Sequence, residues 1–252
     1  VNGEVTGITA TGSVTNVADG EVTNAISYTA GANFKAGNYN IIENKGKLSI
    51  NAKAVTITVD DASKTYGVAD PAFTGTVGEL VNEGDLGTVT YSRTNDAENV
   101  GKYNDVLTAD YTANSNYAVT VVPGDFEITA ATFTVDDIAA VKYNGEEQAQ
   151  APVVKDGDKT LVAGTDYDVT YSEDVTNAGT VTVTITGKGN YTGKIEKTYE
   201  ITRRNVTLTS EGGSKDYDGT ALTKPNVAIT GDGFVNGEVT GITATGSVTN
   251  VA

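Results

Sequence analysis

The chain of 252 residues contains no cysteine, histidine, methionine or tryptophan. Without cysteine it has no disulfide, no thiol nucleophile and no cysteine-ligated zinc site. Without histidine it lacks the usual general base and the commonest ligand of transition metals, which excludes Ser-His-Asp and Cys-His catalysis. We therefore expect no enzymatic activity, no catalytic residues, no resident cofactor and no bound metal.

Positive charge and long apolar runs are also scarce. Seventeen Lys and Arg residues stand against 33 Asp and Glu residues, so the formal net charge is −16. Such a surface repels nucleic acid and anionic lipid, and we expect neither as a partner. The sequence holds no run of about 18 apolar residues, so we expect no membrane insertion.

Alternating apolar and polar residues are what the chain has in quantity. A period of two is typical of strands with one buried and one solvated face, and it predicts an all-β fold. The one helical candidate is residues 77–82, ahead of Gly84, with a loop as the alternative reading. A β-grasp-like module with one short helix therefore stays open. The clearest alternating runs are Val55-Thr56-Ile57-Thr58-Val59, Phe133-Thr134-Val135 and Val181-Thr182-Val183-Thr184-Ile185.

The first eighteen residues return without a mismatch as the last eighteen. Residues 1–18 equal residues 235–252, and the offset from Val1 to Val235 is 234 positions. Eighteen consecutive identities indicate one period of a tandem array with a short overlap into the next copy. A tandem array indicates a function that depends on many consecutive copies of one unit rather than on a single reaction.

A weaker repeat divides this period into three. Each part opens on a Lys-Tyr-Gly-like turn and closes on a short strand that ends in isoleucine. Both series of landmarks are spaced by 78 and then 73 residues, which leaves 83 for the third part. The opening lysines are Lys64, Lys142 and Lys215, and the closing isoleucines are Ile50, Ile128 and Ile201.

An asparagine–tyrosine corner precedes each closing strand. We expect these tyrosines, Tyr39, Tyr117 and Tyr191, to anchor small cores with the ring buried and the hydroxyl near water. The linkers at 51–53, 129–131 and 202–204 contain neither glycine nor proline and are too short to be flexible tethers. The sequence therefore predicts small β-modules joined end to end as an elongated, semi-rigid rod.

Several motifs resemble known modules of bacterial surface proteins. Residues 64–74, Lys-Thr-Tyr-Gly-Val-Ala-Asp-Pro-Ala-Phe-Thr, resemble the opening of the YGX-type MBG module of adhesins, and residues 99–103 and 124–128 match its later landmarks. Residues 215–220 resemble the opening of the related YDG-type module. Residues 186–193 are similar to repeats of bacterial Ig-like cell-surface proteins.

This resemblance gives the expected domains. Residues 1–53 are the rear part of a YDG-type module, and residues 54–131 are a YGX-type MBG module. Residues 132–204 are an Ig-like or MBG-related module, and residues 205–252 are the front part of the next YDG-type module. Whether each module has an Ig-like or a β-grasp fold stays open.

The resemblance implies a protein of the bacterial cell surface, outside the cell, and it carries over no catalytic residue. We expect a structural spacer or stalk repeat of an extracellular adhesin or surface fibre. The alternative is an adhesive module that binds carbohydrate or protein on host or neighbouring cells. An exposed aromatic patch would be the sign of the alternative.

Acidic side chains supply the remaining candidates for chemistry. A glycosidase needs two carboxylates at a set separation in a cleft, but adjacent side chains on a strand point to opposite faces. Calcium takes six to eight oxygen ligands, and residues 156–158 and 216–219 each offer only two carboxylates beside a glycine. We therefore expect solvated charge at the candidate pairs Asp60/Asp61, Asp136/Asp137, Glu146/Glu147 and Asp156/Asp158.

An internal Lys–Asn isopeptide bond is a further candidate in a cysteine-free surface protein. It needs an asparagine or aspartate on a strand that faces the lysine. The closing strands at 48–50, 126–128 and 198–201 contain no asparagine. We therefore do not expect this cross-link.

The divided third module implies a self-contact. Residues 205–252 lack its rear part and residues 1–53 lack its front part, so each half would present unpaired strand edges. Either the chain is a window of a continuous polypeptide, or separate chains dock head to tail into an open filament. Self-association in one of these forms is the expected partner; a host glycan or surface protein is the partner of the adhesive alternative.

Overall fold

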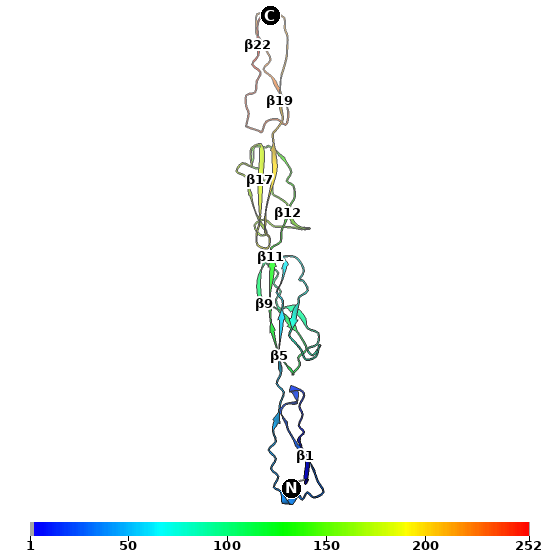
Figure 1. The fold of residues 1–252 in the computed structure, drawn as a ribbon. Coiled ribbons are helices and arrows are strands. Elements are labelled where there is room, and N and C mark those ends of the chain that lie inside the picture. Colours follow the sequence, from blue (N-terminus) through cyan, green and yellow to red (C-terminus); the bar gives the residue numbers. More distant parts are fainter. Residues whose placement is uncertain (1–2, 252) are drawn as a thin grey trace. The chain divides into compact units, whose positions relative to one another are not determined.

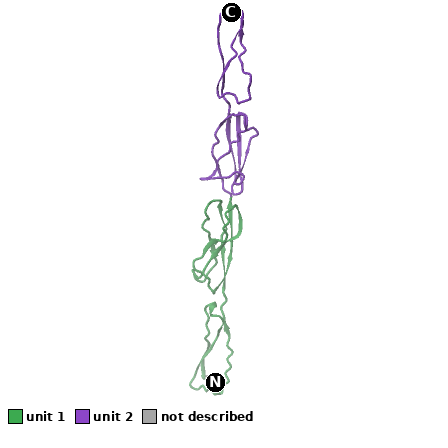
Figure 2. Ribbon diagram, turned by 180° about the vertical axis from the view of Figure 1, so that it is seen from behind, with its two compact units in different colours: residues 1–129 green, residues 130–252 purple. Residues whose placement is uncertain are grey.

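The computed structural model describes residues 3–251, which are strand and loop with two 3₁₀ turns (η1, Val17–Asp19; η2, Ala36–Asn38) and no α-helix (Figure 1). The predicted all-β fold class is confirmed. No helix in this range has the length and hydrophobicity that a bilayer crossing requires. The chain divides into two compact units, Val1–Thr129 and Ala130–Ala252, which Figure 2 colours separately.

Residues 77–82 are not a helix. Their backbone amides take partners outside the segment, because the Gly78 amide donates to Thr56 O at 2.8 Å and the Val81 amide donates to the Tyr117 hydroxyl at 2.8 Å. A helix over 77–82 would need the Val81 amide for the Val77 carbonyl, whereas the Gly78 amide would have no acceptor within the helix. The short helix of a β-grasp-like module is therefore absent from residues 3–251. Val77 ends a strand and residues 78–82 are a loop, so the loop alternative is confirmed for 78–82.

The first unit begins with two small antiparallel pairs. Strand β1 (Val5–Ala10) pairs with β3 (Ile26–Ala30), and β2 (Val22–Thr23) pairs with β4 (Lys47–Leu48). No residue among 3–53 is buried. This part of the chain therefore has strands but no closed core.

Two sheets with a shared core follow in the same unit. The first has the order β10 (Tyr117–Val122), β5 (Lys53–Val59), β7 (Gly75–Val77), with β10 parallel to β5 and β7 antiparallel to it. The second has the order β6 (Ala62–Thr65), β11 (Gly124–Thr129), β9 (Gly101–Asp110), β8 (Thr90–Arg93), with β6 parallel to β11. The chain changes sheet between β5 and β6 and again between β10 and β11.

The alternation in β5 explains this core. Val55, Ile57 and Val59 are buried, and the threonines between them are exposed. From the second sheet Phe126 and Leu107 reach full burial, so the inward faces of both sheets meet. The complete buried cluster is Val55, Ile57, Val59, Leu86, Leu107, Ala109, Tyr117, Phe126 and Ile128.

The second unit repeats the two-sheet plan in residues 130–204. One sheet has the order β12 (Thr134–Val135), β14 (Val154–Asp156), β15 (Lys159–Thr160). The other has the order β13 (Val141–Lys142), β18 (Lys194–Thr202), β17 (Gly179–Gly187), β16 (Tyr167–Tyr171), with β13 parallel to β18. Alternation again sets the burial: Val181, Val183 and Ile185 are buried.

Residues 205–251 complete the second unit without a core. Strand β19 (Val206–Ser210) pairs with β21 (Val227–Gly231), and β20 (Leu222–Thr223) pairs with β22 (Ser247–Val248). None of these residues is buried. Like residues 3–53, this segment has hydrogen-bonded strands but no buried core.

The three Lys-Tyr-Gly-like openings share a backbone conformation. Gly67, Gly145 and Gly219 have φ of 80°, 81° and 77°, in the left-handed region that favours glycine. Of the three predicted tyrosine anchors, Tyr117 and Tyr191 are buried, at 7% and 3% exposure. Tyr39 is 41% exposed, because it belongs to the segment that has no core.

Candidate functional site

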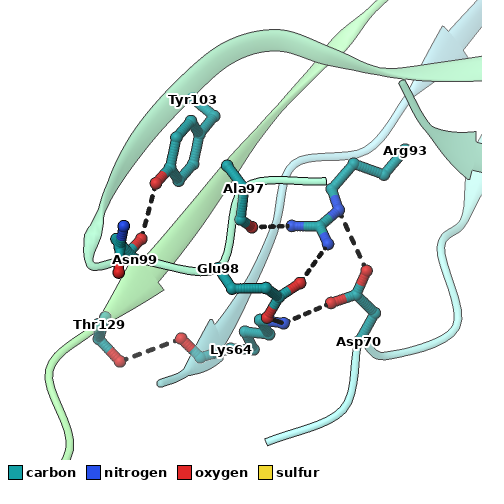
Figure 3. A network of polar contacts seen from close by, with 8 residues as sticks. All are labelled: Lys64, Asp70, Arg93, Ala97, Glu98, Asn99, Tyr103 and Thr129. Atoms are coloured by element: carbon teal, nitrogen blue, oxygen red, sulfur yellow. Dashed lines mark hydrogen bonds and ion pairs between the residues drawn. The ribbon is translucent and has the colours of Figure 1, made fainter. Parts of the chain in front are cut away.

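A ring of four charges closes the loops beside strand β6. Among residues 3–251, Lys64 is the charged residue that is buried, and its side chain is 3% exposed. Its Nζ lies 2.8 Å from Asp70 Oδ1 and also contacts the Glu98 carboxylate. Arg93 at the end of β8 completes the ring, with Nε 3.1 Å from Asp70 and Nη2 2.6 Å from Glu98 (Figure 3).

We name Lys64, Asp70, Arg93 and Glu98 the charged ring. Positive and negative groups alternate around it, so each carboxylate contacts two cations. The remaining donor of the guanidinium, Nη1, bonds Ala97 O at 2.7 Å (Figure 3). The guanidinium also lies 4.9 Å from the centre of the Phe126 ring. The ring thereby ties two loops, 66–74 and 94–100, to the core.

The contacts of the ring favour the charged forms of Lys64 and Glu98. The hydrogen bond that Lys64 donates to Asp70 raises the pKa of Lys64 most, and the one to Glu98 is the next cause. Burial acts in the opposite direction. The hydrogen bond from Lys64 lowers the pKa of Glu98 most, and the one from Arg93 is the next cause. A protonated amine is not a nucleophile, and an ionised carboxylate is a poor electrophile. The arrangement is suited to holding loops in place rather than to bond formation.

Acid should weaken this ring. A carboxyl whose pKa is lowered by folding stabilises the fold above the ordinary glutamate value of about 4.3, and the contribution is lost as pH falls through the lower folded pKa. We expect residues 53–129 to lose stability as the solution is acidified through this range, and Glu98→Gln to show a shallower dependence. Thermal unfolding followed at a series of pH values measures both.

The exposed Glu79 provides the control for this prediction. It lies in the same module outside the charged ring, and Glu79→Gln should keep the acid dependence of the wild type. Equal slopes for Glu98→Gln and the wild type would contradict the role of the ring in acid stability.

The acidic pairs considered from the sequence do not converge on a site. Asp60 accepts a hydrogen bond from Thr74, and Asp61 accepts one from the Asp125 amide, so neighbours on the chain have different partners. Asp136 pairs with Lys155 and Asp137 with Lys197, each at 2.6 Å. Glu146 and Glu147 are exposed. Their carboxylates are used by local structure or face solvent.

The two calcium candidates are also held apart or neutralised. The Tyr191 hydroxyl lies 3.4 Å from Asp156, while Asp158 is exposed. Asp218 pairs with Lys215 at 2.8 Å and accepts a bond from the Thr220 amide. Across residues 3–251, no three acidic side chains gather closely enough to hold a metal ion.

Asn116 forms a joint between the two parts of the first unit. Its side-chain oxygen accepts the Val17 amide at 2.8 Å, and its side-chain nitrogen donates to Asn16 at 3.0 Å. Its backbone oxygen accepts the amide of Lys53, at the start of β5. One side chain therefore fixes a loop of the preceding segment against the first strands of the next module.

Arg204 forms the corresponding joint in the second unit. Its Nε donates to Gly233 O at 2.7 Å, Nη1 to Tyr143 O at 3.3 Å, and Nη2 to Asp232 O. The Asp232 side chain pairs with Lys142, and this contact, with the Asn205 amide, lowers the pKa of Asp232. Residues 130–204 are thus tied to residues 205–251 by more than the covalent linker.

We expect Asn116→Ala to loosen the first joint. It removes two hydrogen bonds, each worth about 0.5–1.5 kcal/mol, without touching the core. The ¹⁵N relaxation of residues 3–50 should become distinct from that of residues 53–129. Asn104→Ala, at an exposed position of β9, should leave the relaxation unchanged. Unchanged relaxation in Asn116→Ala would show that the joint is not held by this side chain.

The sequence analysis identified Lys64 only as the start of a repeat and Arg204 only as part of a linker. It did not identify the residues that they contact. The one available signal was a lysine at an inward position of an alternating strand, because β6 buries Lys64 between exposed neighbours. Asp70, Glu98, Asn116 and Asp232 carried no such signal, since they lie in loops and act through contacts that are distant in sequence.

Two packed sheets with a shared core, and a charged ring that ties loops to that core, define a small β-module in residues 53–129. The comparison with known families agrees. Residues 55–127 match the family model of the MBG domain (YGX type), which confirms the MBG-type resemblance for this module. The match spans the ring and both sheets of the module. MBG domains are typical of surface proteins, and no curated protein matches the chain.

Proposed function

We propose that the chain is a structural spacer, the repeating stalk segment of an extracellular bacterial adhesin or surface fibre, without catalytic activity. The main observation behind the proposal is that residues 1–18 and 235–252 are identical in sequence. Charged side chains that could carry chemistry instead hold loops and joints, as in the charged ring and around Arg204. Polar joints of this kind favour modules that follow one another stiffly.

We further propose that the domains are the four segments 1–53, 54–131, 132–204 and 205–252, and that the protein resides on the bacterial cell surface. The MBG match supports both statements for residues 55–127. The partner is the same sequence, joined head to tail as a continuous array or between chains.

Length measurements test the spacer. A protein with one period should be compared with one in which residues 19–252 are appended again, both at high dilution. Three modules of roughly 30 Å each predict that one added period lengthens the particle by about 100 Å. Small-angle scattering and electron microscopy measure this increment. A particle that thickens instead of lengthening would rule out the spacer.

An adhesive module is the second candidate, and one observation favours it. Phe34 and Tyr39 stack at 5.6 Å, and Tyr28 meets Phe34 edge-on at 6.4 Å. These rings line an apolar groove of about 420 Å³ in residues 4–43. Sugar rings bind such platforms, so a titration of the protein with oligosaccharides decides whether the groove is adhesive.

A further inference from the structure

The Lys-Tyr-Gly-like opening that begins at Lys142 contributes to the Arg204 joint. Lys142 pairs with Asp232, and the Tyr143 hydroxyl bonds the Glu238 carboxylate. The Tyr143 carbonyl accepts a hydrogen bond from the Arg204 guanidinium at 3.3 Å. Three contacts of the joint thus depend on where two consecutive residues of one turn are held.

The glycine of this opening lies against the next segment. A Cβ added to Gly145 would lie 3.0 Å from Val235 Cγ1 and 3.7 Å from Glu238 Oε1. The φ of Gly145 is 81°, in the left-handed region that favours glycine. A change in the backbone at Gly145 therefore acts directly on residues 205–251.

The residue before this glycine is an asparagine, and the Asn-Gly pair is chemically labile. Asn144 is exposed, and its side-chain oxygen accepts the Glu146 amide at 2.9 Å. This Asx turn holds the side-chain carbonyl over the backbone that follows it. Within residues 3–251 no group accepts a hydrogen bond from the Gly145 amide, and a glycine has no Cβ to hinder attack by its nitrogen. The nucleophile and the carbonyl carbon are therefore close together, and neither is shielded.

The third Lys-Tyr-Gly-like opening shows the backbone that an aspartate adopts at this place. Its equivalent residue is Asp218, whose carboxylate accepts the Thr220 amide at 2.9 Å, and Gly219 has the same left-handed backbone. Asp218 also pairs with Lys215, the lysine of its own opening, at 2.8 Å. An aspartate in place of Asn144 is therefore compatible with the turn and offers the opening lysine a local partner.

We propose that Asn144 is a site of spontaneous deamidation, and that the products loosen the joint between residues 130–204 and 205–251. The Gly145 nitrogen attacks Asn144 Cγ, and the bond from Cγ to the side-chain nitrogen breaks. That nitrogen leaves as ammonia with the proton of the Gly145 amide, and a cyclic succinimide remains. Water then adds to one of the two ring carbonyls and opens the ring to aspartate or isoaspartate. The reaction consumes water and needs no oxidant or reductant.

Both products act on the contacts of the joint. An aspartate at this position is ionised at neutral pH, since the ordinary pKa of aspartate is about 3.9. It competes with Asp232 for Lys142 and adds a negative charge beside Glu238. An isoaspartate adds a methylene to the backbone and so displaces Gly145, which packs on the next segment. Either change weakens the attachment of residues 205–251.

The first measurement follows the reaction in the full chain. Protein is incubated in mildly alkaline buffer, and peptide mass spectrometry with separation of aspartate and isoaspartate gives the conversion of each asparagine. Every chain carries Asn236→Gln, because Asn236 also precedes a glycine at this joint. Asn104, which is exposed and precedes Asp105, is the internal reference. Asn144 should convert several times faster than Asn104 and yield both products.

The second measurement follows the joint. The ¹⁵N relaxation of residues 205–250 is compared with that of residues 131–202. Asn144→Asp should make the two distinct before any incubation, whereas Asn144→Gln should match the parent chain before and after it. The incubated parent should move toward Asn144→Asp. Asn104→Asp adds the same charge in the first unit and should leave this joint unchanged.

Three outcomes would overturn the proposal. Asn144 could convert no faster than Asn104. The fully converted parent and Asn144→Asp could both keep the relaxation of the fresh parent. The incubated Asn144→Gln chain could loosen as much as the incubated parent, and another change would then be responsible.

The inference goes beyond the spacer function and does not depend on it. Its failure would leave the length increment of the spacer experiment untouched. In a stalk, deamidation of Asn144 would make the Arg204 joint a place where stiffness declines with the age of the protein.

Discussion

Phe126→Ala is expected to unfold the MBG module at moderate temperature. Phe126 is fully buried, meets Phe73 edge-on at 5.6 Å and lies under the Arg93 guanidinium. Removing such a ring costs about 3–5 kcal/mol in lost burial and cavity formation. The 73 residues from 55 to 127 would supply a stability of about 4–11 kcal/mol at the usual value per residue. The loss is therefore a large share of the total.

Hydrogen exchange in β9, which pairs with β11 around Phe126, reports this loss without interference from other modules. Phe126→Leu, which keeps most of the volume, should cost less than about 1.5 kcal/mol. Val81→Ala, at an exposed loop position of the same module, should change exchange little. A tolerated Phe126→Ala would mean that the two sheets do not depend on one shared core.

Arg93→Ala is expected to have the second-largest effect, about 2–3 kcal/mol. The change removes both ion pairs of the guanidinium, its bond to Ala97 O and its contact with the Phe126 face. Breaking a buried ion pair costs about 3–5 kcal/mol. The expected value here is lower because the carboxylates of Asp70 and Glu98 are 30% and 57% exposed and water can solvate them.

Arg93→Lys separates charge from geometry. A lysine keeps the positive charge but cannot direct three planar donors to Asp70, Glu98 and Ala97 at once. We expect it to recover less than half of the loss in hydrogen exchange at β8 and β9. Arg203→Ala, an exposed arginine in the second unit, is the control and should be neutral for this module. If Arg93→Lys kept the full protection from hydrogen exchange, the positive charge alone would account for the stability of the ring, and the planar geometry of arginine would not be needed.

The consequences for function follow from where the charge is placed. The ring closes loops over a core that carries no reactive group, and Asn116 and Arg204 connect neighbouring segments. A stalk needs modules that resist unfolding and joints that resist bending. Under the proposed spacer function, the charged side chains of the ring and of Arg204 serve those two purposes.

Strand positions were predictable because alternation is a local property. From Val55 to Val59 in β5 and from Val181 to Ile185 in β17 every second residue is apolar, and those residues are the buried ones. Gly67, Gly145 and Gly219 likewise mark turns that need a left-handed backbone, whatever surrounds them. The sequence left residues 77–82 open between helix and loop, because the groups that bind their amides, Thr56 O and the Tyr117 hydroxyl, are distant in sequence.

The charged ring could not be predicted, since Lys64 and Glu98 are 34 residues apart and meet only when two loops fold over the core. The exposure of Tyr39 has the same kind of cause. Its motif matches those of Tyr117 and Tyr191, but it lies in residues 3–53, where the structure buries no side chain.

The sequence by itself determined the all-β class, the positions of the long strands and the tandem period, because backbone periodicity and identity of residues are written locally. Only the tertiary structure decided which charges meet around Lys64, which side chains join the segments and which strands enclose a core. Those depend on the distances between parts of the chain that folding brings together, and no local pattern encodes a distance.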